Sequence, residues 1–329
     1  MEKMIAVTGA TGHIGNVLVR KLLARGETVR VIVPPFEDIE PLEGLEVEIV
    51  EGDVRDADSL IKAFRSAEIV YHLAGIVTIS SGNDDFIYQV NVEGTKNVVN
   101  ACLKNNVKRM AYVSSVHALK EPPHGTVIDE TCDYDPECTR GSYDRSKALA
   151  SLEVIKGIDK NLDAVLVCPS GVIGPYDYRI SQMGHLFINF MKGDLKARVD
   201  GAYDFVDVRD VAEGIILACK KGKCGESYVL AGEQISVQDL FLELEKLTGI
   251  KAPSLKVPLW IVKAVSKVSP LYYKVTGKEP LFTTYSIEVI NSNSQISSNK
   301  AFNELDYFPR PIKESIKDSV EWIRKNIEF

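Results

Sequence analysis

The chain has 329 residues, of which 45% are hydrophobic and 26% charged, and its formal net charge at pH 7 is −7. These values are typical of a globular protein with a sizeable core in one large domain or two modest ones, and the acidic balance argues against a nucleic-acid partner. No apolar run reaches the roughly 18 residues of a membrane span and no signal peptide precedes the first predicted strand, so we expect a cytoplasmic protein with no membrane partner.

The N-terminal residues predict a strand, a glycine-rich turn and a helix in succession. The apolar run 4–7 is typical of a buried parallel strand. Three glycines spaced Gly-x-x-Gly-x-x-Gly follow, and apolar residues then recur at helical spacing from Ile14 to Leu23, with Gly26 as the expected C-cap. In this context the glycines favour a dinucleotide site, because they let a pyrophosphate approach the amides at the helix N-terminus. A purely structural glycine turn is the alternative.

Strands and helices alternate through most of the chain. Further strands are predicted over residues 28–33, 47–50, 68–75, 109–115, 163–168 and 227–230. Helices are predicted over residues 59–65, 84–105, 142–157, 207–218, 237–248 and 319–326, with Asp58 and Ser236 as the N-caps of the first and fifth. This alternation predicts an α/β, Rossmann-like fold with a doubly wound parallel sheet, whose ligands bind beyond the C-terminal ends of the strands.

Beyond Pro169 the alternation breaks, which indicates a second, smaller C-terminal lobe. We assign residues 1–171 and 205–233 to a dinucleotide-binding domain, and residues 172–204 and 234–329 to a substrate-binding lobe. Residues 258–268 are amphipathic, and we favour a helix packed on its own domain over one lying on a membrane surface.

Six cysteines are scattered along the chain, and none of their spacings is that of a metal site. Cys102, Cys168 and Cys219 lie in apolar contexts and are predicted to be small core residues. A disulfide between Cys132 and Cys138 is disfavoured in a cytosolic chain. We therefore expect neither a metal nor a disulfide.

A phenol and an ammonium are four residues apart in the segment from Tyr143 to Lys147. Residues i and i+4 share a helix face, so Lys147 is placed to lower the pKa of Tyr143 and to reach a ribose hydroxyl. Ser115 ends a predicted strand at the ligand edge, where its hydroxyl can polarise a substrate carbonyl. Ser114 should point the opposite way, because strand residues alternate. An exposed helix face is the alternative explanation for the Tyr-x-x-x-Lys spacing.

Taken together, the motifs resemble those of the extended short-chain dehydrogenase/reductase superfamily almost from end to end. They include Thr8-Gly-Ala-Thr-Gly-His-Ile-Gly15, His72-Leu-Ala-Gly75 and Phe205-Val-Asp-Val-Arg-Asp-Val-Ala212. The catalytic residues are then Ser115, Tyr143 and Lys147. The NAD(P) site implied by the residues and by the resemblance consists of Gly9, Thr11, Gly12, His13, Ile14, Gly15, Asp53, Val54, Leu73, Ala74, Gly75, Asn91, Ser114, Tyr143, Lys147 and Pro169. In it Asp53 and Val54 flank the adenine, and Asn91 supports the active-site helix.

Two features are similar to the branch of dihydroflavonol 4-reductases, cinnamoyl-CoA reductases and hydroxysteroid dehydrogenases. Family members that act on nucleotide sugars usually carry, in place of Gly171, an Asn that contacts the substrate diphosphate. The tail, including Ser298-Asn-Lys-Ala301 and Val320-Glu-Trp322, also resembles this branch. An epimerase or dehydratase that retains its NAD is the alternative, because bacterial sugar epimerases share some of these features. A non-catalytic dinucleotide sensor is a third hypothesis.

The residue that follows the second strand of this fold distinguishes NAD from NADP. An acidic side chain there binds the ribose 2′-hydroxyl of NAD, and an Arg binds the 2′-phosphate of NADP. This chain has Pro34, which is neither. Glu37 and Asp38 would repel a phosphate if they folded back, whereas His13 or Arg55 could contact one. We therefore expect NAD(P), with NAD favoured.

The expected reaction is hydride transfer between nicotinamide and a ketone or secondary alcohol of a small, fairly apolar substrate. Candidate wall residues, for which ordinary packing is an equally good explanation, are His117, Tyr178, Met183, Phe187 and Phe205. The predicted helices 84–105 and 142–157 carry apolar residues beyond one narrow stripe. Such helices pair across a two-fold axis in this superfamily, so the resemblance implies a homodimer.

Overall fold

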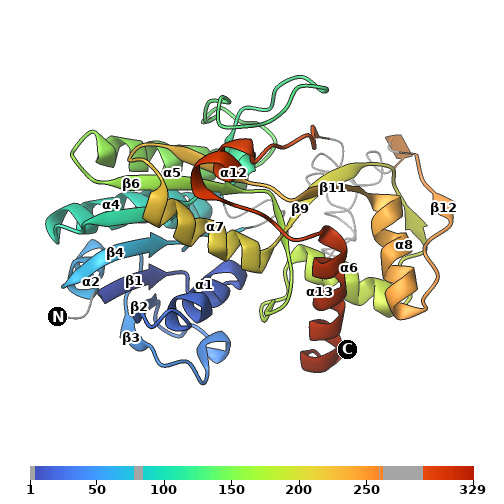
Figure 1. Cartoon of the computed structure of the whole chain (residues 1–329), viewed down its shortest axis with the longest axis horizontal. Coiled ribbons are helices and arrows are strands. Elements are labelled where there is room, and N and C mark those ends of the chain that lie inside the picture. The colour runs from blue at the N-terminus through green and yellow to red at the C-terminus, as the bar shows by residue number, and fades with distance from the viewer. Residues whose placement is uncertain (1–3, 78–83, 259, 262–291) are drawn as a thin grey trace.

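A seven-stranded parallel sheet forms the centre of the larger lobe (Figure 1). The computed structural model describes residues 4–77, 84–258, 260–261 and 292–329. In strand order the sheet consists of β10 (Ser227–Leu230), β6 (Ala164–Pro169), β5 (Arg109–Val113), β4 (Ala67–His72), β1 (Met4–Thr8), β2 (Thr28–Val33) and β3 (Glu48–Glu51). The chain runs outwards from β1 in both directions, so the point between β1 and β4 is where a doubly wound sheet binds its ligand. The predicted Rossmann-like fold is confirmed.

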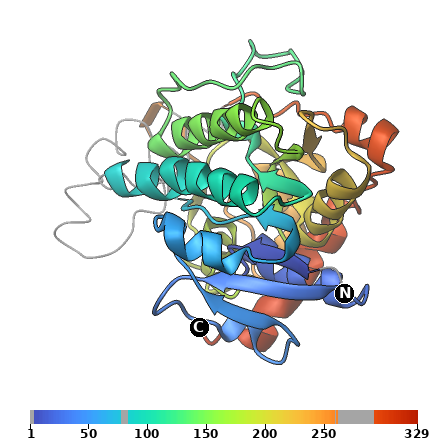
Figure 2. The same cartoon turned by 90° about the vertical axis from the view of Figure 1, so that its left-hand side faces the viewer.

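Helices cover both faces of this sheet, and the sheet separates two hydrophobic cores. One face is covered by α1 (His13–Leu23), α7 (Val208–Lys221) and α12 (Asn299–Leu305). The other is covered by α2 (Ala57–Ala63), α4 (Gly94–Lys104) and α5 (Ser142–Ile158), and Figure 2 shows α4 and α5 side by side. Within β1, Ile5 and Val7 belong to the first core and Ala6 to the second, because successive strand residues face opposite ways.

The smaller lobe is built around a third hydrophobic core. It contains a three-stranded sheet of β11 (Glu233–Ser236), β9 (Ala202–Asp207) and β7 (Gly171–Ile173), and a two-stranded pair of β12 (Leu255–Lys256) and β8 (Ala197–Arg198). Its helices are α6 (Gln182–Met191), α8 (Val237–Thr248) and α13 (Ile312–Asn326). None of these strands was predicted, because each depends on pairing with a distant segment. The predicted boundary between residues 204 and 205 falls within β9.

Several predicted element ends differ from the structure. The long helix predicted over 84–105 is divided into α3 (Asp84–Tyr88), a π-helical segment η2 (Gln89–Glu93) and α4. The N-cap of α2 is Asp56 rather than Asp58, because the Asp56 carboxylate accepts hydrogen bonds from the amides of Asp58 and Ser59. The prediction of Gly26 as a C-cap is also wrong.

The ends of α1, α8 and α13 can be compared with the sequence predictions in the same way. Helix α1 ends at Leu23 with Ala24 as its C-cap, and Gly26 follows with a φ of +74°. Ser236 caps α8 as predicted, through a hydrogen bond from the amide of Asp239. Helix α13 begins seven residues before the predicted terminal helix. Single-turn 3₁₀ helices are η1 (Glu40–Leu42) and η3 (Val116–Ala118).

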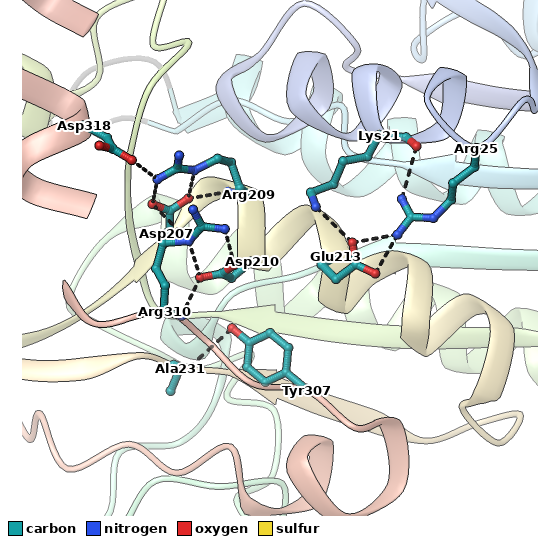
Figure 3. Close-up of polar contacts among 10 residues, drawn as sticks. All are labelled: Lys21, Arg25, Asp207, Arg209, Asp210, Glu213, Ala231, Tyr307, Arg310 and Asp318. Atoms are coloured by element: carbon teal, nitrogen blue, oxygen red, sulfur yellow. Dashed lines mark hydrogen bonds and ion pairs between the residues drawn. The ribbon is translucent and has the colours of Figure 1, made fainter. Parts of the chain in front are cut away.

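Ion pairs join the beginning of α7 to the C-terminal segment of the smaller lobe (Figure 3). The guanidinium of Arg209 pairs with Asp207, the N-cap of α7, at 2.7 Å and with Asp318 of α13 at 2.6 Å. Arg310, which precedes α13, pairs with Asp210 at 2.8 Å. Burial by itself raises the pKa of Asp207, but the hydrogen bonds from Arg209 outweigh it, so the net pKa is lowered.

The remaining sequence predictions concern cysteines, metals and membranes. Cys102, Cys168 and Cys219 are buried, as predicted, and all six cysteines are free. Among the described residues, no cluster of His, Cys, Asp and Glu could hold a metal ion, and no helix has the length and apolarity needed to cross a bilayer. Most of the amphipathic segment 258–268 lies outside the described residues.

Candidate active site

The glycine-rich turn lies between the end of β1 and the beginning of α1. Gly9 has a φ of +71°, and a Cβ atom there would lie 2.5 Å from the backbone nitrogen of Ala74. Gly12 is the N-cap of α1, and its amide donates to the carbonyl of Gly9 at 3.1 Å. The turn therefore packs directly against the segment that follows β4. Only a residue without a side chain fits there, and the N-terminus of α1 is left facing a site suited to a pyrophosphate.

A chain of buried hydrogen bonds lies beneath this turn. The hydroxyl of Thr8 accepts a hydrogen bond from the amide of Ala74 at 3.3 Å, so its own proton points to Nδ1 of His72 at 2.7 Å. Nε2 of His72 then donates to the hydroxyl of Thr95 at 2.9 Å, which donates to the carbonyl of Asn91 at 2.6 Å. Burial lowers the pKa of His72 to about 3, which keeps the imidazole neutral in this single tautomer.

Asn91 joins the segment after β4 to the helix that carries the catalytic residues. Its side chain accepts from the amide of Ile76 at 2.7 Å and donates to the carbonyl of Ile76 at 3.1 Å. It also donates to the hydroxyl of Ser146 at 2.8 Å, and Ser146 in turn donates to the carbonyl of Tyr143 at 2.7 Å. Because Asn91 lies in the π-helical segment 89–93, the irregular turn positions this amide between the two elements.

Ser114 and Ser115, at the end of β5, point in opposite directions. The hydroxyl of Ser115 accepts the amide of His117 at 3.1 Å and hydrogen-bonds the phenol of Tyr143. The hydroxyl of Ser114 forms a 2.7 Å hydrogen bond with Ser151 inside the protein. The side chain of Ser114 therefore points towards α5, as alternation along the extended chain predicts, and its place among the cofactor residues stays a prediction.

Tyr143 and Lys147 share one face of α5, but burial dominates the pKa values of both. Burial raises the pKa of Tyr143 to about 12, opposed by the hydrogen bond from Ser115. Burial also lowers the pKa of Lys147 to about 8. The ammonium donates to the carbonyl of Val113 at 2.6 Å and lies 4.8 Å from the centre of the Tyr112 ring. Burial and the Ser115 hydrogen bond dominate the Tyr143 pKa here, and the lowering expected from Lys147 stays a prediction.

Gly75 lies beside these residues. A Cβ atom at Gly75 would lie 3.3 Å from Oδ1 of Asn91 and 3.8 Å from Nζ of Lys147. The segment after β4 therefore packs close to the ammonium. Together with the close packing at Gly9, this arrangement fits a dinucleotide that extends from the N-terminus of α1 to Lys147.

The other predicted cofactor residues lie around the same edge of the sheet. Leu73 continues β4 beside Thr8, and Pro169 ends β6. At the expected adenine end, Asp53 forms a 2.5 Å ion pair with Arg55 that lowers the pKa of its carboxyl, and the carbonyl of Val54 accepts from Asn97. Gly15 and Ile14 lie within the first turn of α1.

Each of the two groups expected to contact a phosphate is engaged by a neighbouring group. Arg55 is held by Asp53, and Nε2 of His13 donates to the carbonyl of Pro175 at 2.9 Å. Glu37 does fold back: its carboxylate accepts a 3.0 Å hydrogen bond from the hydroxyl of Thr11 in the glycine-rich turn. That contact also involves Arg179, which the sequence analysis missed because no motif connects it with residues so distant in the chain.

Two aromatic side chains of the smaller lobe, Tyr203 and Phe205, pack together near His117. The hydroxyl of Tyr203 lies 2.6 Å from Nε2 of His117, and their rings stack. Phe205 packs edge-on against Tyr203, with ring centres 5.4 Å apart. A Cβ atom at Gly171 would lie 2.7 Å from both the Tyr203 and the Phe205 rings. Position 171 therefore has no room for a side chain beneath this aromatic wall.

The remaining candidate wall residues have other neighbours. Phe187 is 1% exposed within the core of the smaller lobe, and Met183 packs against that core. Tyr178 meets Trp322 of α13 edge-on, with ring centres 5.2 Å apart. These three side chains are thus explained by packing, and Phe205 also belongs to that core, whereas the amide of His117 donates to the hydroxyl of Ser115.

The fold and the site define an NAD(P)-dependent enzyme of the extended short-chain dehydrogenase/reductase type. The chain belongs to the NAD dependent epimerase/dehydratase family, whose sequence model matches residues 5–231. It is 35% identical to sterol demethylase protein B of Methylococcus capsulatus over 97% of this chain and 98% of that protein. It is 31% identical to a "Putative dihydroflavonol 4-reductase" of Synechocystis over 99% of this chain and 96% of that protein.

A solved structure matches the whole chain equally well. The crystal structure of gox2253 is 34% identical, with a TM-score of 0.88, and the match covers 99% of each chain. The similarity therefore includes both lobes and the connections between them.

Proposed function

We propose that this enzyme transfers a hydride between NAD and a ketone or secondary alcohol of a small, fairly apolar substrate. The observation that carries the proposal is the aromatic wall over Gly171. In place of an amide that could hold a diphosphate, the site has the packed rings of Tyr203 and Phe205. Without that amide the site lacks a polar anchor for a diphosphate, and burying a charged diphosphate beside apolar rings is unfavourable, so an apolar substrate is favoured.

In this proposal each residue of the trio has a separate task. When bound, NAD supplies or accepts the hydride. Tyr143, whose raised pKa keeps the phenol protonated near neutral pH, donates its proton to the carbonyl oxygen of a ketone during reduction. Ser115 donates a hydrogen bond to the same oxygen, and Lys147 holds a ribose hydroxyl. In the oxidation direction Tyr143 must first lose its proton, so oxidation should accelerate with rising pH.

The preference for NAD rests on Glu37. Glu37 follows the glycine-rich turn by about 20 residues in the sequence. Its carboxylate nevertheless accepts a hydrogen bond from Thr11 of that turn. An acidic residue in this region binds a ribose 2′-hydroxyl and repels a 2′-phosphate. NADP would therefore bind more weakly than NAD.

The names of two relatives support an apolar, ring-containing substrate. Sterol demethylase protein B and the dihydroflavonol 4-reductase resemble this chain over nearly its full length. We propose a fused-ring alcohol or ketone, such as a hydroxysteroid, as the substrate class. A nucleotide-sugar epimerase or dehydratase is the alternative, because the family includes such enzymes.

The test combines substrate profiling with one substitution. Purified enzyme is assayed for NADH oxidation with 3-ketosteroids and dihydroflavonols, and for conversion of UDP-glucose without net change in nicotinamide absorbance. We expect turnover of the ring ketones, and Tyr143→Phe should reduce kcat by at least about 100-fold while leaving the Kd for NADH nearly unchanged. Tyr178→Phe, which alters a phenol packed on Trp322, is the matched control. Turnover of UDP-glucose alone would establish the alternative.

We also propose a homodimer formed through the face of α3, α4 and α5. Phe86 and Tyr88 of α3 are 43% and 45% exposed on this face. Burying them against a second copy would be favourable. Sedimentation should give a mass twice that of the chain, and a monomer at micromolar concentration would refute this assembly.

A further inference from the structure

A loop of the smaller lobe lies against the first turns of α1. This loop, residues 174–181, connects β7 to α6. His13 donates to the carbonyl of Pro175 at 2.9 Å, and the amide of Asn16 donates to the carbonyl of Tyr176 at 3.1 Å. Asn16 is completely buried. The substrate lobe is therefore fastened to the helix whose N-terminus faces the cofactor site.

The geometry of this loop directs Arg179 back towards the glycine-rich turn. Ile180 has a φ of +45°, a conformation that β-branched residues rarely adopt. The reversal is stabilised by the carboxylate of Asp177, which accepts from both the amide and the hydroxyl of Ser181 at 2.7–3.0 Å. The position of Arg179 is thus determined by the loop backbone as well as by its own partners.

The guanidinium of Arg179 contacts both Thr11 of the glycine-rich turn and Glu37. Its Nη2 donates to the hydroxyl of Thr11 at 3.0 Å and forms an ion pair with Oε1 of Glu37. The hydroxyl of Thr11 donates to the same carboxylate oxygen at 3.0 Å. The side chains of Arg179 and Glu37 are 47% and 23% exposed, so a ligand can reach both. A cation and an anion from different lobes therefore meet at one point of the turn.

We propose that Arg179 is a cofactor-selecting residue that the substrate lobe contributes to the dinucleotide site. Paired with Arg179, the Glu37 carboxylate is held where it accepts the ribose 2′-hydroxyl of NAD. When Glu37 is neutralised, Arg179 becomes the ligand of the 2′-phosphate of NADP. This inference rests on the proposed function, since it requires a dinucleotide in the glycine-rich turn.

The charges explain why the pair selects rather than merely binds. An arginine can form a bidentate contact with a phosphate, but here it is engaged by a carboxylate that would lie beside the incoming phosphate. A 2′-phosphate would have to displace Glu37 and then remain next to its negative charge. A 2′-hydroxyl can donate to the carboxylate while the ion pair stays intact. NAD therefore binds without the loss of the inter-lobe contact.

The experiment measures the Kd of NADH and NADPH by isothermal titration calorimetry, without turnover. The proteins are the wild type, Glu37→Gln, Arg179→Ala and the double variant. We expect the wild type to bind NADH more tightly, and Glu37→Gln to bind NADPH about 10- to 100-fold more tightly than the wild type does. Adding Arg179→Ala to Glu37→Gln should abolish that gain. Arg179→Ala alone should weaken NADH binding, and Arg179→Lys should partly restore it because the charge is kept.

Two matched controls separate this effect from general changes in charge. Asp38→Asn removes a neighbouring exposed carboxylate that accepts the amide of Glu40 at 2.9 Å, rather than a hydrogen bond from Arg179 or Thr11, so the NADH/NADPH affinity ratio should change little. Arg198→Ala removes another arginine of the smaller lobe, which pairs with Asp200, and should also leave the NADH/NADPH affinity ratio unchanged.

The outcomes distinguish the inference from the proposed function. A wild type that binds neither dinucleotide would overturn the proposed function itself. A wild type that prefers NADPH would overturn both the role proposed for Glu37 and the cofactor-selecting role of Arg179. If the wild type prefers NADH but Arg179→Ala leaves the NADPH affinity of Glu37→Gln unchanged, only the role of Arg179 is overturned.

Discussion

Arg310 and Asp210 join the C-terminal segment to the first turn of α7 through three hydrogen bonds (Figure 3). The backbone nitrogen and Nε of Arg310 donate to Oδ2 of Asp210 at 2.8 and 2.9 Å, and Nη2 donates to Oδ1 at 2.8 Å. The hydrogen bonds that Arg310 donates to Asp210 raise the pKa of Arg310. Because the Asp210 side chain is only 10% exposed, this pair is a fixed connection between the lobes.

Replacing Arg310 by Ala should therefore destabilise the protein. The free energy of unfolding should fall by about 2 kcal/mol, since a largely buried carboxylate loses two of its three donors. The free energy of unfolding of Arg310→Lys should lie between those of the wild type and Arg310→Ala, because a lysine keeps the charge but not the forked geometry. Urea unfolding provides the measurement. The control is Arg324→Ala, which removes an exposed arginine with one weak 3.4 Å hydrogen bond and should change little. Equal effects at both positions would contradict this account.

Lys147 should make the stability depend on pH in the alkaline range. Its pKa is about 8 in the folded protein and near its ordinary value of 10.5 in the unfolded chain. Between these values the unfolded chain binds the proton more readily, so protonation favours unfolding and stability rises with pH. From about pH 8 to about pH 9.5 the contribution is about 2 kcal/mol.

Lys147→Met removes this titration and provides the test. Unfolding free energies of the wild type and the variant are compared near pH 7 and near pH 9.5. The wild type should gain about 2 kcal/mol relative to Lys147→Met as the pH rises, whereas activity of the variant should be lost at both values. A constant difference between the two proteins would show that Lys147 keeps its ordinary pKa.

His72 should produce the corresponding effect in acid. Its pKa is lowered to about 3 by burial, so the folded protein cannot accept the proton that the unfolded chain binds below its ordinary value of 6.5. Stability should then fall by about 2 kcal/mol between pH 6.5 and about pH 5. In His72→Gln this part of the acid loss should disappear, while an amide can still bridge Thr8 and Thr95. An acid response equal to that of the wild type would argue against a neutral, buried His72.

Gly171→Ala should disturb the aromatic wall without affecting the cofactor site. The added Cβ would lie 2.7 Å from the rings of Tyr203 and Phe205, so we expect a loss of about 1–3 kcal/mol in stability and a lower kcat/KM for the ring ketone. The Kd for NADH should stay the same. In the double variant Gly171→Ala/Phe205→Leu, the smaller leucine side chain should recover part of the lost stability. No recovery would mean that the wall does not set the space at position 171.

Sequence patterns predicted the parts of the site that depend on local order. The glycine spacing after β1 and the i, i+4 spacing of Tyr143 and Lys147 follow from the geometry of one turn and one helix. The alternation of Ser114 and Ser115 follows from the geometry of one strand. By contrast, the helix over 84–105 was predicted as continuous, because its apolar periodicity does not reveal the π-helical segment around Asn91. Asp56 was missed as an N-cap because Asp58 is an equally good capping residue by type.

The sequence by itself determined the doubly wound sheet, the family and the class of cofactor, and it placed Tyr143 and Lys147 on one helix face. Each of these depends on short-range periodicity and on the spacing of particular residue types. Tertiary structure alone decided the strands of the smaller lobe, the burial of Tyr143 and the meeting of Arg179 with Glu37. Burial and contacts between distant segments are set by how the whole chain packs, and no local pattern encodes them.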